Sequence, residues 1–406
     1  MTENVLEKLA ATNPNCEIWW DSSPLVYRQW ATKVLTDAPE AKRESWTEQL
    51  DRLFDPETAH QSGIMGFHGV TTNPPLSLQA IQADPEYWIG EIHRLIDQNP
   101  KDDVEAIYWK AYLETVRRGA ELILPVFKKS GGKYGFLSGQ VDPRFVTDLG
   151  RMRANAADLK AIGPNVMVKV PGSKEGYQLI EELTAEGVST NNTTSFTVPQ
   201  YKACMDAVSR GLARAKSNGI DLSNWRSVIT HMSARLGNIG DLLWQAKERG
   251  INVTPEEVTL GELAVMKRAY RYIQETGHPS KMLMCSMRVT HDPVTNKASS
   301  WHIEKLAGGD FVYTCPPSYI STLMQHEDSI APFDGNAINE DISGDSLNKL
   351  LQLPYFRQAY EFDGMESDEF SQFGAFTATA AEFAVATRKT IDFVARVYAD
   401  AKRQAA

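Results

Sequence analysis

Short apolar segments alternate with longer amphipathic ones along almost the whole chain. The short segments have the length and the bounding turn residues of buried strands, whereas the longer ones repeat apolar residues every three or four positions, as a helix does. The eight predicted strands are residues 17–21, 64–70, 134–141, 165–170, 187–194, 225–230, 281–286 and 310–314. Eight strands that are each followed by a helix predict a parallel (β/α)8 barrel, the α/β fold known as a TIM barrel. A doubly wound open sheet is the alternative, but the glycine-rich first turn that it usually carries is absent.

Two parts of the chain exceed a minimal barrel. Residues 77–133 have room for two or three helices between the second and third strands. The C-terminal part, 326–406, begins as a linker rich in Pro, Gly and Asp and continues in helical patterns at 346–360 and 367–402. We therefore expect residues 1–406 to form one barrel domain with a helical extension packed on it. The pattern leaves open whether this extension narrows the barrel mouth, forms an interface or does neither.

Charge and composition exclude several classes of partner and cofactor. The net charge of −10 argues against nucleic acid or an anionic membrane as a partner, because both need a basic face. The sequence has neither an uninterrupted apolar stretch of about 18 residues, as a membrane span needs, nor a secretory signal. The four cysteines lack a CxxC spacing and suit buried thiols in a reducing cytoplasm. Without an HxH, HExxH, GxGxxG or Walker-type motif, we expect chemistry that uses no metal and no cofactor.

A lysine lies in the apolar strand 165–170. The alternation of side chains turns Lys169 into the barrel interior if the valines on either side of it face the helices. Burial lowers the pKa of an amine and leaves it a neutral nucleophile, which can form an imine and so allow an adjacent carbon–carbon bond to break or form. A lysine at a strand end can also reach solvent or pair with a carboxylate, and this strand alone does not decide between these roles.

The other strand ends supply a carboxylate, carboxamides, hydroxyls and two guanidinium groups to the face that forms the active site in such a barrel. In chain order these residues are Asp21, Asn73, Gln140, Asn191, Thr193, Thr230, Arg235, Ser286 and Arg288. Together with the amine, this set would bind a phosphorylated sugar and form a Schiff base with its carbonyl. The anionic phosphate would be held in this acidic protein by the arginines, whose forked groups match its oxygens.

Five segments resemble motifs of transaldolases, which belong to the superfamily of class I, Schiff-base-forming aldolases. These segments are GVTTNPPL (69–76), VMVKVPGSKEG (166–176), GVSTNNTTSF (187–196), THMSARLG (230–237) and MCSMRV (284–289). Their order and spacing agree with the family over roughly residues 15–320. The resemblance implies a (β/α)8 barrel, an imine on Lys169 and phosphorylated sugar substrates.

The resemblance also implies catalytic roles for three further residues. Asp21 would move protons to and from substrate hydroxyls, and Thr193 would assist imine formation through a water. Gln140 stands where transaldolases usually have a Glu that polarises the catalytic water, and a carboxamide can position a water but cannot accept its proton. Fructose 6-phosphate aldolases carry Gln at this place, so the resemblance leaves the balance between transfer and release of the three-carbon unit open.

Substrate-binding roles are implied for six residues. The donor hydroxyls would be bound by Asn73, Asn191 and Thr230, and the phosphate by Arg235, Ser286 and Arg288. Some of these residues also have purely structural interpretations: Asp21 could cap the following helix, Asn73 could form a turn, and the arginines could pair with acidic residues of neighbouring helices. We interpret Trp19 and Trp20 as packing residues.

The sequence therefore predicts a cytoplasmic transaldolase. Lys169 would attack the C2 ketone of a ketose phosphate, such as fructose 6-phosphate or sedoheptulose 7-phosphate, and pass a dihydroxyacetone unit to another aldehyde. The alternatives are an aldolase that releases dihydroxyacetone and a non-catalytic barrel that binds sugar phosphates. The sequence does not decide the donor, the acceptor, the oligomeric state (a homo-oligomer is one option), or whether the pathway is central, such as the pentose phosphate pathway, or specialised.

Overall fold

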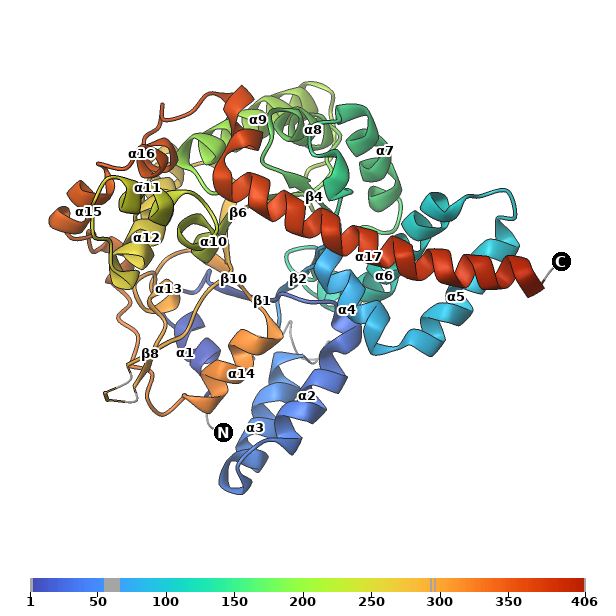
Figure 1. The fold of residues 1–406 in the computed structure, drawn as a ribbon, viewed down its shortest axis with the longest axis horizontal. Coiled ribbons are helices and arrows are strands. Elements are labelled where there is room, and N and C mark those ends of the chain that lie inside the picture. Colours follow the sequence, from blue (N-terminus) through green and yellow to red (C-terminus); the bar gives the residue numbers. More distant parts are fainter. Residues whose placement is uncertain (1–2, 55–65, 293, 296, 405–406) are drawn as a thin grey trace.

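The computed structural model describes residues 3–54, 66–292, 294–295 and 297–404. Eight parallel strands form a closed barrel in the order β1-β10-β7-β6-β5-β4-β3-β2, with helices around it (Figure 1). The strands are β1 (Glu17–Trp20), β2 (Gly69–Thr71), β3 (Phe136–Gln140), β4 (Val166–Pro171), β5 (Thr190–Thr193), β6 (Ser227–Met232), β7 (Lys281–Cys285) and β10 (Phe311–Cys315). Each lies within or overlaps a predicted strand, although residues 64–65 of the second prediction lie outside the described residues. The predicted (β/α)8 barrel is confirmed.

Helices and 3-10 turns connect these strands. The helices are α1 (Val5–Ala10), α2 (Tyr27–Thr36), α3 (Glu40–Leu53), α4 (Pro74–Ala83), α5 (Pro85–Gln98), α6 (Val104–Lys129), α7 (Leu149–Lys160), α8 (Lys174–Ala185), α9 (Val198–Ser217), α10 (Ser233–Asn238), α11 (Leu242–Glu248), α12 (Pro255–Thr276), α13 (Trp301–Glu304), α14 (Pro317–Gln325), α15 (Gly344–Leu350), α16 (Pro354–Tyr360) and α17 (Gly374–Gln404). The 3-10 turns are η1 (Pro24–Val26), η2 (Pro143–Phe145), η3 (Ala337–Asn339) and η4 (Ser367–Gln372). The helices α4, α5 and α6 fill the long segment between β2 and β3, as predicted.

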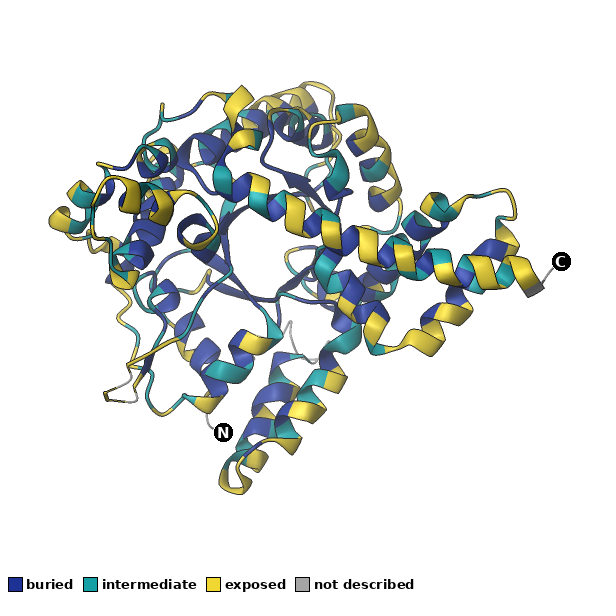
Figure 2. Ribbon diagram, in the orientation of Figure 1, coloured by how far each residue is buried: buried dark blue, intermediate teal, exposed yellow. Residues whose placement is uncertain are grey.

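The strands are buried almost throughout, and most of them are rich in apolar residues, although β5 (TNNT) is buried and entirely polar. Figure 2 shows the barrel strands as buried, with the exposed positions on the outer faces of the surrounding helices. In the register of the sheet, Gln140 on β3 pairs with Lys169 on β4, and Lys169 pairs with Asn191 on β5. Paired residues of neighbouring parallel strands point to the same face, so these three polar side chains share one level of the barrel.

A cluster of paired charges closes the amino-terminal end of the barrel. Glu17 on β1 is buried and forms ion pairs with Arg226 and with Lys281, whose Nζ lies 3.0 Å from the carboxylate. Burial alone would raise the pKa of Glu17, but the two cations hold it at about 2. Ion pairs at this end of a barrel serve the fold, whereas the chemistry of barrel enzymes lies at the opposite end.

The sequence did not predict a small hairpin, β8 (Thr290–His291) with β9 (Ala298–Ser299), which follows β7. Each strand has only two residues, too few to show an alternating pattern. The predicted helix at 346–360 is instead two helices, because Pro354 lacks the N–H that a helix interior needs and begins α16. Within the described residues no helix is long and apolar enough to cross a membrane. All four cysteines are buried and free, as the sequence suggested.

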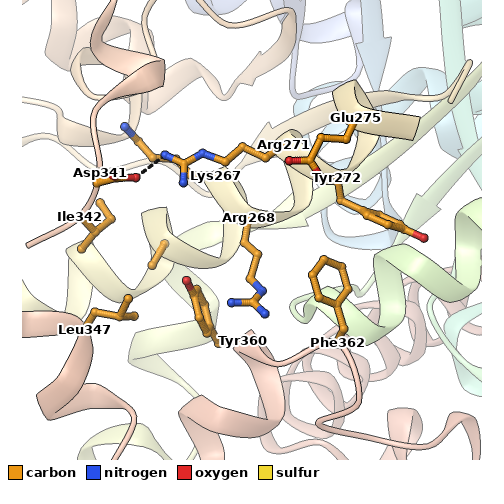
Figure 3. Close-up of a pocket in the computed structure, with 11 residues that line it drawn as sticks. Lys267, Arg268, Arg271, Tyr272, Glu275, Asp341, Ile342, Leu347, Tyr360 and Phe362 are labelled. Carbon is orange, nitrogen blue, oxygen red and sulfur yellow. Dashed lines mark hydrogen bonds and ion pairs between the residues drawn. The ribbon is translucent and has the colours of Figure 1, made fainter. Parts of the chain in front are cut away.

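The C-terminal extension packs on the barrel helices. The helices α15 and α16 contact α12, where the guanidinium of Arg268 stacks 4.3 Å from the ring of Tyr360 and 4.8 Å from that of Phe362 (Figure 3). The long helix α17 contacts α4, α10 and η2, which follow the carboxyl ends of β2, β6 and β3. Figure 1 shows α17 running past the barrel towards α5. The extension thus reaches the end of the barrel where the candidate residues lie; a single domain for the whole chain stays a prediction.

Gly69→Ala is expected to destabilise the fold by about 1–3 kcal/mol, because a Cβ on β2 would lie 2.5 Å from the ring of the buried Trp19. Chemical denaturation measures this loss. Gly90→Ala is the matched control, since its Cβ would meet nothing within 4 Å and alanine favours the helix α5. A Gly69→Ala protein as stable as the Gly90→Ala protein would contradict the expectation.

Candidate active site

Lys169 extends from β4 into the barrel. Its Nζ donates a hydrogen bond to the carbonyl oxygen of Thr72, which follows β2, at 3.1 Å. The residue is only 5% exposed, and this burial lowers the pKa of Lys169, while the negative charge of Asp21 partly opposes the change. Its hydrogen-bond partner is a neutral carbonyl, so neither solvent nor an ion pair explains the position of the amine. The structure gives the interior orientation that the alternation of the strand predicted.

Asp21 follows β1 and faces the same interior. Its Oδ1 accepts a hydrogen bond from the Thr71 hydroxyl at 2.6 Å, and Thr71 in turn lies 2.6 Å from the hydroxyl of Thr314. Burial raises the pKa of Asp21, although the Lys169 charge and the Thr71 hydrogen bond act in the opposite direction. The residue that caps η1 is Ser23, so the alternative of a capping role for Asp21 is wrong.

A hydrogen-bonded carboxamide lies beside Lys169. Asn191 Nδ2 donates to the Ser138 hydroxyl at 2.9 Å, and Asn191 Oδ1 accepts from the Thr230 hydroxyl at 2.8 Å. The amide orientation is therefore fixed by partners on both sides, on β3 and β6. Two predicted ligands of the donor hydroxyls, Asn191 and Thr230, are brought together in this way.

Two buried polar atoms beside these residues have no hydrogen-bond partner in the described part of the chain: Gln140 Oε1 and Thr193 Oγ1. The Gln140 backbone is held firmly, because Tyr112 Oη donates to its carbonyl at 2.9 Å and accepts from its N–H at 2.8 Å. Nearly all buried polar atoms of native proteins are paired, so exceptions call for an explanation. Both oxygens therefore keep the capacity to bond a water or a ligand hydroxyl.

Backbone strain occurs at the same end of the barrel. Among the described residues, Thr194 (φ 48°) and Ser286 (φ 58°) are the two non-glycine residues with positive φ. Thr194 follows Thr193 at the end of β5, and Ser286 directly follows Cys285, the last residue of β7. Such conformations cost of order 1–3 kcal/mol and cluster at functional sites. The strained residues therefore lie at two strand ends where the sequence predicted site residues, Thr193 and Ser286.

Arg235 lies on α10, directly after β6, and is held by the C-terminal helix. Its two terminal nitrogens donate to the carboxylate of Glu382 on α17 at 2.6 and 3.0 Å. Nη1 also lies 3.4 Å from the hydroxyl of Thr379, and the guanidinium lies 5.6 Å from the ring of Phe383. The guanidinium fork thus faces a carboxylate of the extension.

Arg288 follows β7 and pairs with a buried carboxylate on α12. Its terminal nitrogens lie 2.7 and 3.2 Å from the two oxygens of Glu262, and Glu262 Oε2 also accepts from His302 Nε2 at 3.0 Å. Arg288 Nη1 lies 3.5 Å from the carbonyl oxygen of Ala234, the neighbour of Arg235. Both arginines therefore lie by α10, and both have the acidic partners that the sequence analysis gave as the alternative to phosphate binding.

Three further residues have structural roles, namely Asn73, Trp19 and Trp20. Asn73 caps α4, because its Oδ1 accepts from the N–H of Leu76 at 3.0 Å. This is the turn chemistry that the sequence offered as the alternative to hydroxyl binding. Trp19 and Trp20 are 0% exposed, which confirms that they pack in the core.

Sequence reasoning missed several residues of this site. Ser138 could have been found, since it lies two positions before Gln140 on the same face of β3. Thr71 and Thr314 likewise lie at strand ends, but hydroxyls there are too common to single out. No signal pointed to Glu382, which lies 147 residues after Arg235.

Comparison with known proteins decides the family. Residues 57–370 match a family model described as transaldolase/fructose-6-phosphate aldolase. The chain belongs to this family. It is similar to a transaldolase of Thiobacillus denitrificans (28% identity over 313 residues, 72% of this chain and 84% of that one). Further similar proteins are transaldolases of Saccharopolyspora erythraea (30% over 271 residues; 64% and 72%) and Mycolicibacterium smegmatis (26% over 343 residues; 80% and 91%).

The match to the transaldolase/fructose-6-phosphate aldolase family model ends before α17 begins.

The cavity in Figure 3, about 370 Å³ in volume, lies between α12 and the C-terminal extension, and none of the candidate residues lines it. A larger cavity, about 970 Å³ in volume, has Arg288 in its lining. The other candidate residues are recognised by the arrangement of side chains at the strand ends. No three His, Cys, Asp or Glu side chains in the described ranges come together as a metal site would require.

Proposed function

We propose that this chain is a transaldolase that moves a dihydroxyacetone unit from a ketose phosphate to an aldehyde through an imine on Lys169. The observation that carries the proposal is the buried Lys169 amine with its lowered pKa, on the same interior as Asp21. An amine in this state is a nucleophile, and a carboxyl with a raised pKa can exchange protons. The family and the names of the similar proteins support the same reaction class.

The steps follow from these two groups. Lys169 Nζ adds to the ketone carbon of the donor, and loss of water gives a protonated imine. Asp21 accepts the proton of the hydroxyl beyond the adjacent carbon–carbon bond, and that bond breaks as its electrons move into the imine. The aldose phosphate leaves, and the three-carbon enamine attacks the acceptor aldehyde while Asp21 returns the proton. Addition of water then frees the product from Lys169.

In these reaction steps, Asn191 and Thr230 would bind substrate hydroxyls, because their hydrogen bonds fix the direction of the amide beside Lys169. Thr193 Oγ1 and Gln140 Oε1 are buried atoms with bonding capacity left for a water or a substrate hydroxyl. Asn73, at the start of α4, stays a weaker candidate, since its Oδ1 caps the helix.

The phosphate would be held by Arg235 and Arg288, with Ser286 beside them. The ion pair of Arg235 is the easier one to exchange for a phosphate, because the side chain of Glu382 is 54% exposed and a half-exposed pair contributes little stability. The partner of Arg288, Glu262, has a side chain that is 0% exposed, so this pair also belongs to the structure of the fold. Arg235 is therefore the stronger candidate for the phosphate ligand.

The experiment that tests the proposal is borohydride reduction in the presence of fructose 6-phosphate, followed by peptide mass mapping. A reduced three-carbon adduct on Lys169 is expected, and its absence with every ketose phosphate would leave only the non-catalytic barrel. The pentose phosphate pathway, a cytoplasmic location and the oligomeric state are parts of the proposal that this experiment does not address.

A second candidate, an aldolase that releases dihydroxyacetone, is favoured by one observation, the carboxamide of Gln140 in the place of the usual carboxylate. Gln140→Glu adds a titratable group beside Lys169, so we expect activity to be retained with a changed pH dependence. It should also shift the ratio of transfer to free dihydroxyacetone, measured with fructose 6-phosphate with and without an acceptor aldehyde.

Gln79→Glu is the matched control, because it makes the same chemical change at an exposed position on α4. We expect transfer to dominate in the native protein. If the native protein releases dihydroxyacetone without an acceptor as fast as it transfers the unit to an added aldehyde, the aldolase is favoured. A Gln140→Glu protein with the ratio and pH profile of the Gln79→Glu control would show that residue 140 does not act on the catalytic water.

A further inference from the structure

The C-terminal helix places a carboxylate on the guanidinium that is the best candidate for binding phosphate. Glu382 approaches both terminal nitrogens of Arg235, one oxygen to each, at 2.6 and 3.0 Å. This two-point arrangement is the one by which a guanidinium fork also binds phosphate oxygens. A carboxylate and a phosphate cannot both have the same two N–H groups, so they compete.

Arg235 is held in position by contacts other than its ion pair with Glu382. Thr379, which is fully buried, and the ring of Phe383 contact the guanidinium from the same helix. Glu382 is the exposed member of this group and can turn to water without opening the core. The helix α17 therefore holds the fork in place whether or not the carboxylate occupies it.

We propose that Glu382 is a specificity-determining residue that competes with the substrate phosphate for Arg235. The inference rests on the proposed function, in which Arg235 binds that phosphate. An internal competitor weakens the binding of every phosphorylated ligand by the same factor and leaves unphosphorylated ligands unaffected. Glu382 thereby limits how strongly a phosphorylated sugar is preferred, and it eases the release of the aldose phosphate product.

The position of Glu382 in the chain gives the C-terminal extension a function. The segment that matches the family model ends at residue 370, so the competitor comes from outside it. Since α17 also contacts α4 and η2 at the carboxyl ends of β2 and β3, the helix is fixed at the barrel end where the substrate would bind. The extension therefore tunes the phosphate site besides covering the barrel helices.

The test is Glu382→Gln, which keeps the size of the side chain and removes its charge. We expect the KM for fructose 6-phosphate and the inhibition constant of inorganic phosphate to fall together by about two- to fivefold, the range of a part-exposed ion pair. The kcat should not rise, and the KM for unphosphorylated fructose should stay the same. Asp392→Asn is the matched control: it removes one exposed negative charge from the same helix, away from Arg235, and should change neither constant.

The outcomes separate this inference from the proposed function. Arg235→Ala should abolish inhibition by inorganic phosphate, alone or combined with Glu382→Gln. If Arg235→Ala leaves that inhibition intact, the phosphate assignment in the proposed function is wrong. If Arg235→Ala abolishes it but Glu382→Gln behaves like the wild type or binds phosphate more weakly, the competition is refuted and Glu382 only positions the arginine.

Discussion

Replacing Lys169 with alanine is expected to abolish turnover and the borohydride adduct together. The amine is the nucleophile of the proposed reaction, and removal of a nucleophile typically costs roughly 10⁴- to 10⁶-fold in kcat. The fold should persist, because Lys169 makes one hydrogen bond to a carbonyl and its buried amine is costly to keep. Circular dichroism and thermal denaturation check that the variant is folded.

The chain contains a control for the claim that position, rather than burial, makes this lysine reactive. Lys267 on α12 is also buried, and burial lowers its pKa to about 8, but its Nζ donates to the carbonyls of Ala337 and Glu340 outside the barrel. Peptide mapping should find the three-carbon adduct on residues 165–176 and none on the peptide that contains Lys267. An adduct on Lys267, or on any lysine of the Lys169→Ala protein, would refute the assigned mechanism.

The features that the sequence revealed are those with a local pattern. The eight short segments between amphipathic ones were enough to predict the barrel, because most of the strands are apolar and buried; β5 (TNNT) is buried but polar. The period of two in VMVKVP was enough to direct Lys169 inwards, since the valines on either side of it need the opposite face. The positions of residues at the strand ends then predicted that one end of the barrel would hold Asp21, Gln140, Asn191 and Thr230, although the sequence gives no distances.

The features that the sequence did not reveal depend on contacts between distant segments. Glu382 and Glu262 are ordinary helical carboxylates in sequence, and only the packing of α17 and α12 brings them to Arg235 and Arg288. Asn73 shows a different reason, because the same side chain suits a helix cap and a hydroxyl ligand. Residue type therefore gave the chemistry of the candidate site, whereas the competition for its arginines required the tertiary structure.

Arg235→Ala is expected to weaken the binding of phosphorylated donors by about 2–4 kcal/mol, because a phosphate bound there loses a charged two-point hydrogen bond. Unphosphorylated fructose should be far less affected, and the free energy of unfolding should hardly change, since Glu382 is left half-exposed in water. Comparison of kcat/KM for the two sugars measures the effect. Equal losses for both substrates would contradict a phosphate site at Arg235.

Arg288→Ala should weaken phosphate binding by a similar amount, but it should also destabilise the fold by about 3–5 kcal/mol, because it leaves the buried carboxylate of Glu262 with His302 alone. The double variant Arg288→Ala with Glu262→Gln removes that stranded charge, and its amide oxygen can still accept from His302. We therefore expect the double variant to regain most of the lost stability, measured by denaturation, while its affinity for the phosphorylated donor stays low. If affinity returns with stability, Arg288 acts only through its pair with Glu262, and Arg235 is the sole arginine of the two that binds phosphate.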